Sequence, residues 1–249
     1  VVCNIGQAHL EFFHDLRGVA TEKGALLAGT DENGWAIFPR EAEGYDILLE
    51  QAGKRRCLTF GSSPDADVRS EYLGLQNGLF RVRLSWRNSC TSREFNWQLG
   101  GAHQALNAAA AAAAGMAFGL TPDEIIRGLQ NCVLPGQRME VREIDGITWC
   151  NDAYNSNPDS ARAALDWFAE LSANAEKRVL ILGDMRELGG NAEMAHFELL
   201  QKARQDFPEA RIIAVGALCA EAARSLDIEH FPDTDTAKAA LKGAFSSGT

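Results

Sequence analysis

Several motifs that would fix a function at once are missing from this sequence. It contains no GxGxxG, which argues against a dinucleotide-binding fingerprint, and no GxxxxGK[ST], the loop that cradles the phosphates of ATP. Its six cysteines lie far apart and never form a CxxC pair, and no signal-like segment opens the chain. We therefore expect reduced, mostly structural thiols and a cytoplasmic location. No apolar run approaches the length of a transmembrane helix, so no membrane insertion is expected.

An excess of positive charge is also missing. Lysine and arginine number 24 against 34 aspartate and glutamate residues, a formal net charge of -10. Bulk charge of this sign would not hold a nucleic acid or an anionic membrane surface. An anionic ligand could still bind through local groups such as helix N-termini or a metal ion.

What the sequence does contain is typical of a folded globular protein. At 249 residues and 46% apolar, the chain is long enough for one large or two modest domains. It opens on an apolar run without a methionine, Val1-Val2-Cys3, and ends just after a predicted helix. We expect a fragment of a longer protein.

The first half predicts an α/β arrangement followed by hairpins. Predicted strands cover 1–5, 35–38 and 56–60, and predicted helices cover 19–28 and 41–52. Short alternating runs over 66–99, with Asn77-Gly78 between two of them, predict antiparallel strands. A helix rich in alanine follows and runs to 118, and Thr121-Pro122-Asp123-Glu124 predicts a capping box that starts the next helix.

Residues 133–137 are the predicted domain boundary. After them, strands and helices alternate, which implies a parallel sheet and a Rossmann-like domain. The predicted strands are 139–144, 147–150, 178–182, 211–215 and 229–231, and the predicted helices are 159–171, 192–205, 217–225 and 234–245.

A dense polar loop lies between the predicted strand 147–150 and the helix that begins near Pro158. Proline suits the first helical turn, and Asn157 can cap the exposed backbone N–H groups. In an open α/β sheet, ligands bind where a strand ends and a helix begins. The same residue types also form ordinary turns, so the loop alone leaves both interpretations open.

Five segments, in order, resemble the Mur ligase family: NIGQAHLEFF with Lys23 downstream, GGAHQALNAAAAAAAG, PGQRMEV, NDAYNSNPDS and LGDMRELGGNAEMAH. The resemblance implies an α/β protein with two parts. Residues 1–136 would be the later part of the central ATP-binding domain, with a parallel sheet plus a small antiparallel sheet. Residues 137–249 would be the Rossmann-like C-terminal domain without its last part. The N-terminal domain and the phosphate-binding loop of the family would precede Val1.

The resemblance also implies metal ligands. His9 matches a histidine that helps to bind magnesium at the ATP phosphates, although a lone loop histidine is more often a plain polar residue. Lys23 matches a lysine that becomes carbamylated and then binds a second magnesium. Such a change is chemically sensible because Mg²⁺ prefers hard oxygen ligands, which lysine itself lacks.

The nucleotide site implied by the resemblance draws on both halves. His103 and Asn107 lie four residues apart on one predicted helix, where Asn107 would read the adenine; plain structural roles remain open for both. Arg138 matches an arginine that would face phosphates when the domains close, and a guanidinium binds phosphate oxygens bidentately. Gln137 stands where the family pattern often passes directly from glycine to arginine.

The polar loop would complete this site. Asp152 matches an aspartate near the ATP ribose and metal, whereas Tyr154, Asn155 and Asn157 match positions that face the nucleotide and the incoming dipeptide. Asp184, Glu187 and His196 complete the match, but a structural role stays open for them, since aspartate after glycine at a strand end commonly caps a turn.

Within the family, the resemblance is closest to the ligases that add D-alanyl-D-alanine to UDP-N-acetylmuramoyl-tripeptide, using ATP and Mg²⁺, in cell-wall precursor synthesis. Lys23 and Arg138 would be the catalytic residues, and we expect a monomer. Because the phosphate-binding loop is absent from the sequence, the isolated chain is expected to be inactive.

Two alternatives stay open. A sister ligase could add a different amino acid, or glutamate to a folate, although such ligases would be expected to carry a histidine in the loop that reads DAYNSNP here. The chain could also be a non-catalytic paralogue or binding module.

Overall fold

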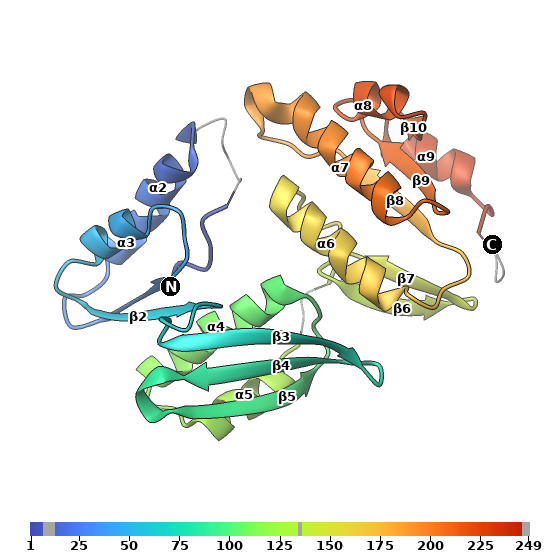
Figure 1. Cartoon of the computed structure of the whole chain (residues 1–249). Helices are drawn as coiled ribbons and strands as arrows, with labels where there is room; N and C mark the ends of the chain where they lie inside the picture. Colours follow the sequence, from blue (N-terminus) through green and yellow to red (C-terminus); the bar gives the residue numbers. More distant parts are fainter. Residues whose placement is uncertain (7–12, 134–135, 246–249) are drawn as a thin grey trace. The chain divides into compact units, whose positions relative to one another are not determined.

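The computed structural model describes residues 1–6, 13–133 and 136–245 (Figure 1). The chain divides into two compact units, Val1–Val133 and Leu134–Thr249. Each unit has its own sheet and its own buried apolar residues. The α/β class expected from the sequence is therefore confirmed in both halves, while the domain boundary at 136/137 stays a prediction.

The first unit is built on one five-stranded sheet. Its strands, in spatial order, are β1 (Trp35–Pro39), β2 (Arg56–Gly61), β3 (Val68–Gln76), β4 (Leu79–Trp86) and β5 (Thr91–Trp97). β1, β2 and β3 pair in parallel, and β3, β4 and β5 pair antiparallel. The predicted parallel and antiparallel parts are thus joined through β3 into a single mixed sheet.

The turn between β3 and β4 forms as its sequence predicts. Asn77 and Gly78 both have left-handed backbone, with φ of 54° and 76°. Two such residues make the tight turn whose twist matches a hairpin. The predicted strand over 1–5 is wrong. Val2 N donates to Ile37 O at 2.8 Å, but residues 1–5 do not form the repeated backbone hydrogen bonds of a paired strand.

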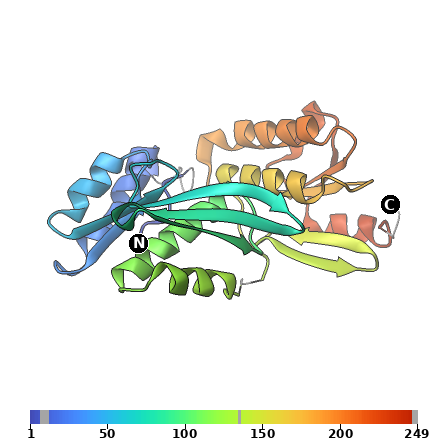
Figure 2. The same cartoon turned by 60° about the horizontal axis from the view of Figure 1, so that its bottom comes forward.

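Helices cover the sheet of the first unit. They are α2 (Leu16–Ala28), α3 (Tyr45–Ala52), α4 (Ala102–Ala117) and α5 (Pro122–Gln130). Leu27 of α2 and Leu48 of α3 are buried in one apolar cluster with Phe38 of β1. The alanines of α4 allow close approach to β1, β2 and β3, and α5 packs against β5 and α4 (Figures 1 and 2). Thr121 and Glu124 form the predicted capping box at the start of α5.

The second unit has a three-stranded parallel sheet in the order β10-β9-β8. Its strands are β8 (Val179–Gly183), β9 (Arg211–Val215) and β10 (Glu229–Phe231), and its helices are α6 (Pro158–Leu171), α7 (Ala192–Asp206), α8 (Ala220–Ser225) and α9 (Thr234–Leu241). Leu165, Leu180, Leu200 and Ala223 join α6, α7, α8 and the sheet in one core. Ala237 of α9 packs with Ile213 and Val215 in a second apolar cluster.

One predicted arrangement in this unit needs correction. β6 (Glu140–Ile144) and β7 (Ile147–Asn151) form a separate antiparallel hairpin and do not belong to the parallel sheet. The cause is Asp145-Gly146, whose φ values of 52° and 75° reverse the chain in two residues. The polar loop that follows β7 therefore leaves a hairpin and not a parallel strand.

Candidate functional site

The polar loop after β7 is fixed to the helix that follows it. Asn157 Oδ1 accepts a hydrogen bond from Ser160 N at 2.9 Å, and Ser160 Oγ accepts one from Asn157 N at 3.0 Å. Pro158 occupies the first turn of α6, so the predicted cap is confirmed. The side chain of Asn157 is engaged in this structural role, whereas Asn155 is exposed.

Two further hydrogen bonds tie the loop to the segment that precedes β6. Met139 N donates to Asp152 Oδ1 at 3.0 Å, and Tyr154 N donates to Gln137 O at 3.2 Å. We call residues 137–139 and 152–154 together the clasp. Through it, the loop and the segment around Arg138 are held as one piece, although they lie 13 residues apart where the Met139–Asp152 bond joins them.

The clasp brings together three of the predicted site residues. The guanidinium carbon of Arg138 lies 4.0 Å from the centroid of the Tyr154 ring. Asp152 is half-buried, and this burial raises the pKa of its carboxyl, against the opposing effects of the Met139 N–H and of Arg138. Burial thus disfavours the charged form of Asp152, while a backbone donor and an arginine favour it.

Backbone strain is concentrated on both sides of Arg138. Gln137 has a φ of 63° and Met139 a φ of 47°, in the left-handed region that residues with a Cβ rarely adopt. Such conformations persist where the surrounding structure over-determines them, and they cluster at functional sites. Here the two clasp hydrogen bonds and the buried Met139 side chain supply that surrounding structure.

In the first unit, the candidate metal ligand Lys23 lies on α2. Its Nζ donates to Asn4 O at 3.1 Å and lies 3.5 Å from Asn4 Oδ1. Burial is the largest effect on this amine, and it lowers its pKa. A larger share of neutral amine follows, and the neutral amine is the form that reacts with CO₂. His9 lies outside the described residues.

The two residues predicted to meet adenine lie on α4, as expected. His103 is in the first turn of the helix, and the exposed Asn107 donates to Gln104 Oε1 at 3.2 Å one turn later. These residues and Lys23 belong to the first unit, while Arg138, Asp152, Tyr154, Asn155 and Asn157 belong to the second.

Asp184 and His196 have structural partners. Backbone N–H groups of Leu218 and Cys219 donate to Asp184 Oδ1 at 3.1 Å and 3.0 Å, so its carboxylate caps the turn before α8. A Cβ on Gly216 would meet that carboxylate at 2.2 Å, which explains why glycine stands there. His196 is buried; its Nε2 accepts from Met185 N, and its Nδ1 lies 2.6 Å from Ala192 O.

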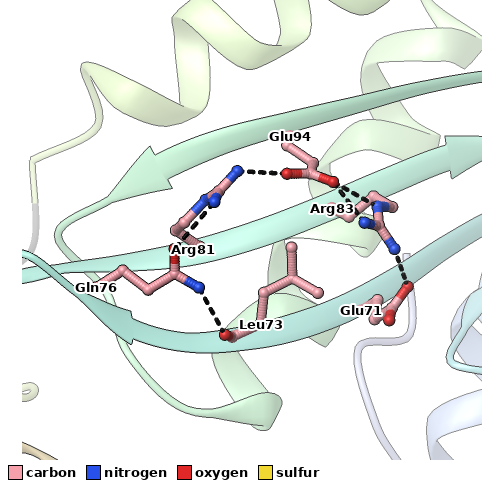
Figure 3. Close-up of polar contacts among 6 residues, drawn as sticks. All are labelled: Glu71, Leu73, Gln76, Arg81, Arg83 and Glu94. Atoms are coloured by element: carbon pink, nitrogen blue, oxygen red, sulfur yellow. Dashed lines mark hydrogen bonds and ion pairs between the residues drawn. The ribbon is translucent and has the colours of Figure 1, made fainter.

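A second polar cluster lies on the outer face of the antiparallel strands (Figure 3). Arg83 NH1 donates to Glu71 at 2.8 Å and Arg83 Nε to Glu94 at 2.9 Å, across three neighbouring strands. Arg81 pairs with the same Glu94 and donates to Gln76 Oε1 at 2.9 Å. We call these residues the ladder; it contains none of the predicted site residues.

Comparisons with known proteins cover both halves of the chain. Residues 1–115 match the Mur ligase middle domain, and residues 137–249 match the Mur ligase glutamate ligase domain. The chain belongs to the Mur ligase family. The five segments that carry the resemblance in the sequence are therefore a correct indication of family.

Two of the similar proteins are curated relatives that carry the same name. A relative from Escherichia coli (strain K12), named UDP-N-acetylmuramoyl-tripeptide--D-alanyl-D-alanine ligase, is 33% identical over 94% of this chain and 51% of its own length. A relative of the same name from Bacillus subtilis (strain 168) is 32% identical over 80% of this chain and 42% of its own length. The chain thus spans about half the length of the curated relatives it matches.

Solved structures agree on the fold. The crystal structure of MurF from Acinetobacter baumannii superposes with a TM-score of 0.84 at 26% identity, over 97% of this chain and 52% of that one. MurF from Thermotoga maritima in complex with ADP gives a TM-score of 0.76 at 22% identity, over 97% of this chain and 53% of that one. At the latter identity the likeness shows the fold alone.

Two observations bear on groups that a Mur ligase would bind. Among the residues that the structure describes, no three histidine, cysteine or acidic side chains group as a metal site. A shallow cavity of about 560 Å³ beside α5 is lined by Arg93, Asp123 and Arg127 among others, and contains none of the predicted residues.

No described helix has the length and apolarity needed to cross a membrane.

Sequence reasoning missed two parts of the site. The left-handed backbone at Met139 carries no sequence signal, because methionine is not a residue that favours this conformation. The contact between Lys23 and Asn4 was also not foreseen, since it joins residues 19 apart through tertiary packing.

Proposed function

We propose that the protein carrying this chain is an ATP-dependent ligase that joins D-alanyl-D-alanine to UDP-N-acetylmuramoyl-tripeptide. The observation that carries the proposal is the match over 94% of the chain to a relative with this named activity, at 33% identity. The clasp supports it, because it presents an arginine on strained backbone beside a half-buried carboxylate.

The proposed reaction has two steps. A carboxylate oxygen of the tripeptide attacks the γ-phosphorus of ATP, and ADP leaves, which gives an acyl phosphate. The neutral amine of D-alanyl-D-alanine then attacks the acyl carbon, phosphate leaves, and the nitrogen loses a proton as the amide forms. Both steps depend mainly on positioning and on neutralising phosphate charge.

Arg138 is the residue best suited to the charge in this unit. A guanidinium presents planar N–H donors that match phosphate oxygens bidentately, and it stays protonated at any physiological pH. In this proposal Arg138 binds phosphate oxygens in the transition state, and Asp152 holds the segment that carries it. Asn155, exposed in the same loop, would contact the acceptor dipeptide, and His103 and Asn107 would contact the adenosine.

Lys23 fits a metal-binding role only after modification. Its half-buried amine, with a lowered pKa, lies beside the oxygens of Asn4. Carbamylation would turn it into an oxygen ligand of the hard type that Mg²⁺ prefers. His9 would be a further ligand by resemblance. Magnesium bound there would neutralise charge on the ATP phosphates.

The test uses the full-length protein that carries this sequence. It is incubated with Mg-ATP, UDP-N-acetylmuramoyl-tripeptide and D-alanyl-D-alanine, and the products are measured by mass spectrometry. We expect the pentapeptide product and ADP in equal amounts, and neither when one substrate is omitted.

Replacing the dipeptide by single amino acids, or the tripeptide by a folate with glutamate, separates the alternatives. A product formed only with one of these would assign a sister activity. No ATP-dependent product with any of them would favour a binding module. Arg224→Ala, which removes an exposed arginine that pairs with Glu221 of the same helix, is the matched control for Arg138→Ala.

A further inference from the structure

We propose that Tyr154 is a positioning residue whose ring holds the guanidinium of Arg138 in place, and that it does not itself bind the substrate. The inference rests on the proposed function, since it assigns a role within that site. It changes the role that the sequence resemblance implies for Tyr154, which is contact with the nucleotide or the dipeptide.

The first support is the backbone on either side of Arg138. Gln137 and Met139 both have positive φ, so the chain turns sharply before and after the arginine. The bond from Tyr154 N to Gln137 O fixes the first of these residues, and the bond from Met139 N to Asp152 Oδ1 fixes the second. The backbone of Arg138 is thus held from both sides by the 152–154 loop.

The second support is the side chain. Arg138 is exposed, and a long exposed side chain samples many rotamers unless something holds its end. Tyr154 supplies that hold, with its ring centroid 4.0 Å from the guanidinium carbon. Both residues of the contact belong to the clasp, so its backbone hydrogen bonds and the Tyr154 ring both hold Arg138.

The third support is what this contact leaves available. A guanidinium that lies against a ring keeps in-plane N–H donors for other partners. Those donors are the groups that bind phosphate oxygens. In the proposed arrangement the ring orients Arg138 without accepting from its in-plane N–H groups, whereas an ion pair with a carboxylate would occupy those groups.

The first arm of the test needs no activity. In the 249-residue chain, the Hε resonance of Arg138 is expected upfield of an unstacked arginine because of the ring current of Tyr154, and Tyr154→Leu should remove this shift. Arg40 over Tyr45 and Arg56 over Trp35, each at 4.5 Å, are internal controls that should stay shifted. An Arg138 resonance that Tyr154→Leu leaves in place would overturn the inference.

The second arm is a double-mutant cycle in the full-length protein. Tyr154→Leu should lower kcat/KM for ATP about fivefold, and Tyr154→Phe, which keeps the ring, should recover most of this loss. In the Arg138→Ala background, Tyr154→Leu should have no further effect, because the group that it positions is gone. An equal loss in both backgrounds would mean that Tyr154 contacts substrate directly, and it would overturn the inference.

The two arms separate the failure of this inference from the failure of the proposed function. If the full-length protein forms no ligated product with any acceptor, the proposed function fails and the role of Tyr154 in ligation fails with it. If the protein ligates and the ring-current shift is absent, the proposed function stands and only the inference is overturned.

Discussion

The ladder and the clasp are both polar clusters that contain arginine, but they are built in opposite ways. In the ladder, Arg83 lies between Glu71 and Glu94 on regular strands whose register places the three residues side by side. In the clasp, Arg138 lies over the ring of Tyr154, and the residues before and after the arginine, Gln137 and Met139, have left-handed backbone. The charges of the ladder are satisfied within the sheet, whereas in the proposed function the arginine of the clasp donates to phosphate oxygens.

The partners of the two arginines separate the clusters: Arg83 pairs with carboxylates, whereas Arg138 lies over an aromatic ring. Cross-strand ion pairs of the ladder kind contribute little individually and mainly favour one strand register. In the clasp, the two left-handed residues cost stability, and conformations of this kind are found most often at functional sites. Three sets of substitutions and one pH series test whether the two clusters differ in this way.

The largest effect is expected from removing the guanidinium of the clasp. Arg138→Ala should lower kcat/KM for ligation by the full-length protein by about a hundredfold or more, since a transition-state charge contact is lost. Arg83→Ala, the corresponding change in the ladder, should leave ligation intact and lower thermal stability slightly. Equal activity losses in the two variants would contradict the distinction.

A smaller effect is expected from the anchor of the clasp. Asp152→Ala removes the carboxylate that accepts from Met139 N, which should cost about 1 kcal/mol of stability and about tenfold in activity. Asp152→Asn keeps an oxygen acceptor at the same position and should retain most of both. If Asp152→Asn were as inactive as Asp152→Ala, the negative charge itself, and not the anchor, would be what the reaction requires.

The two clusters should also respond to pH with opposite sign. Hydrogen bonding to Arg83 lowers the pKa of Glu94, so its contribution to stability is present above the unfolded-state pKa and is lost as the pH falls through the folded-state pKa. Burial raises the pKa of Asp152, so its contribution is present below the unfolded-state pKa and is lost as the pH rises through the folded-state pKa.

Hydrogen exchange between about pH 3 and about pH 6 can measure the pH dependence of stability for each unit separately. Relative to the wild type, Glu94→Gln should make the stability of the first unit rise less with pH. Asp152→Asn should remove the part of the second unit's stability that falls as the pH rises. The same sign in both variants would contradict the assignment of the two carboxyl groups.

The smallest effect concerns strain alone. Gln137→Gly should stabilise the second unit, by at most about 1 kcal/mol, because glycine adopts a φ of 63° without the steric cost of a Cβ. Asn77→Gly, in the turn that closes the ladder hairpin, should gain less, since asparagine already tolerates this conformation. Urea denaturation followed in each unit measures the difference, and an equal gain would mean that Gln137 is not strained.

The parts of the fold that the sequence predicts are those with local causes. Asn77-Gly78 fixes its turn, Thr121 and Glu124 cap α5, and Asn157 with Pro158 starts α6, because each depends on residues within three positions of one another. The residue types of these segments are enough to determine their conformation.

The parts that the sequence does not predict depend on contacts between distant segments. Residues 1–5 do not form the expected strand, because they lack the repeated backbone hydrogen bonds of a paired strand. β6 and β7 form a hairpin, although the alternation of strands and helices in the sequence predicts a parallel sheet. At the candidate site, family resemblance brings Arg138, Asp152 and Tyr154 to attention. It does not indicate that they contact one another, since that follows only from the backbone path of 137–139.

The most direct measurement of the central proposal follows one oxygen atom. Full-length protein is given Mg-ATP, D-alanyl-D-alanine and UDP-N-acetylmuramoyl-tripeptide labelled with ¹⁸O in the carboxylate that reacts. A ligase that works through an acyl phosphate transfers one labelled oxygen to inorganic phosphate, and Arg138→Ala should slow this transfer in proportion to amide formation. Unlabelled phosphate released alongside the amide product would contradict the proposed chemistry.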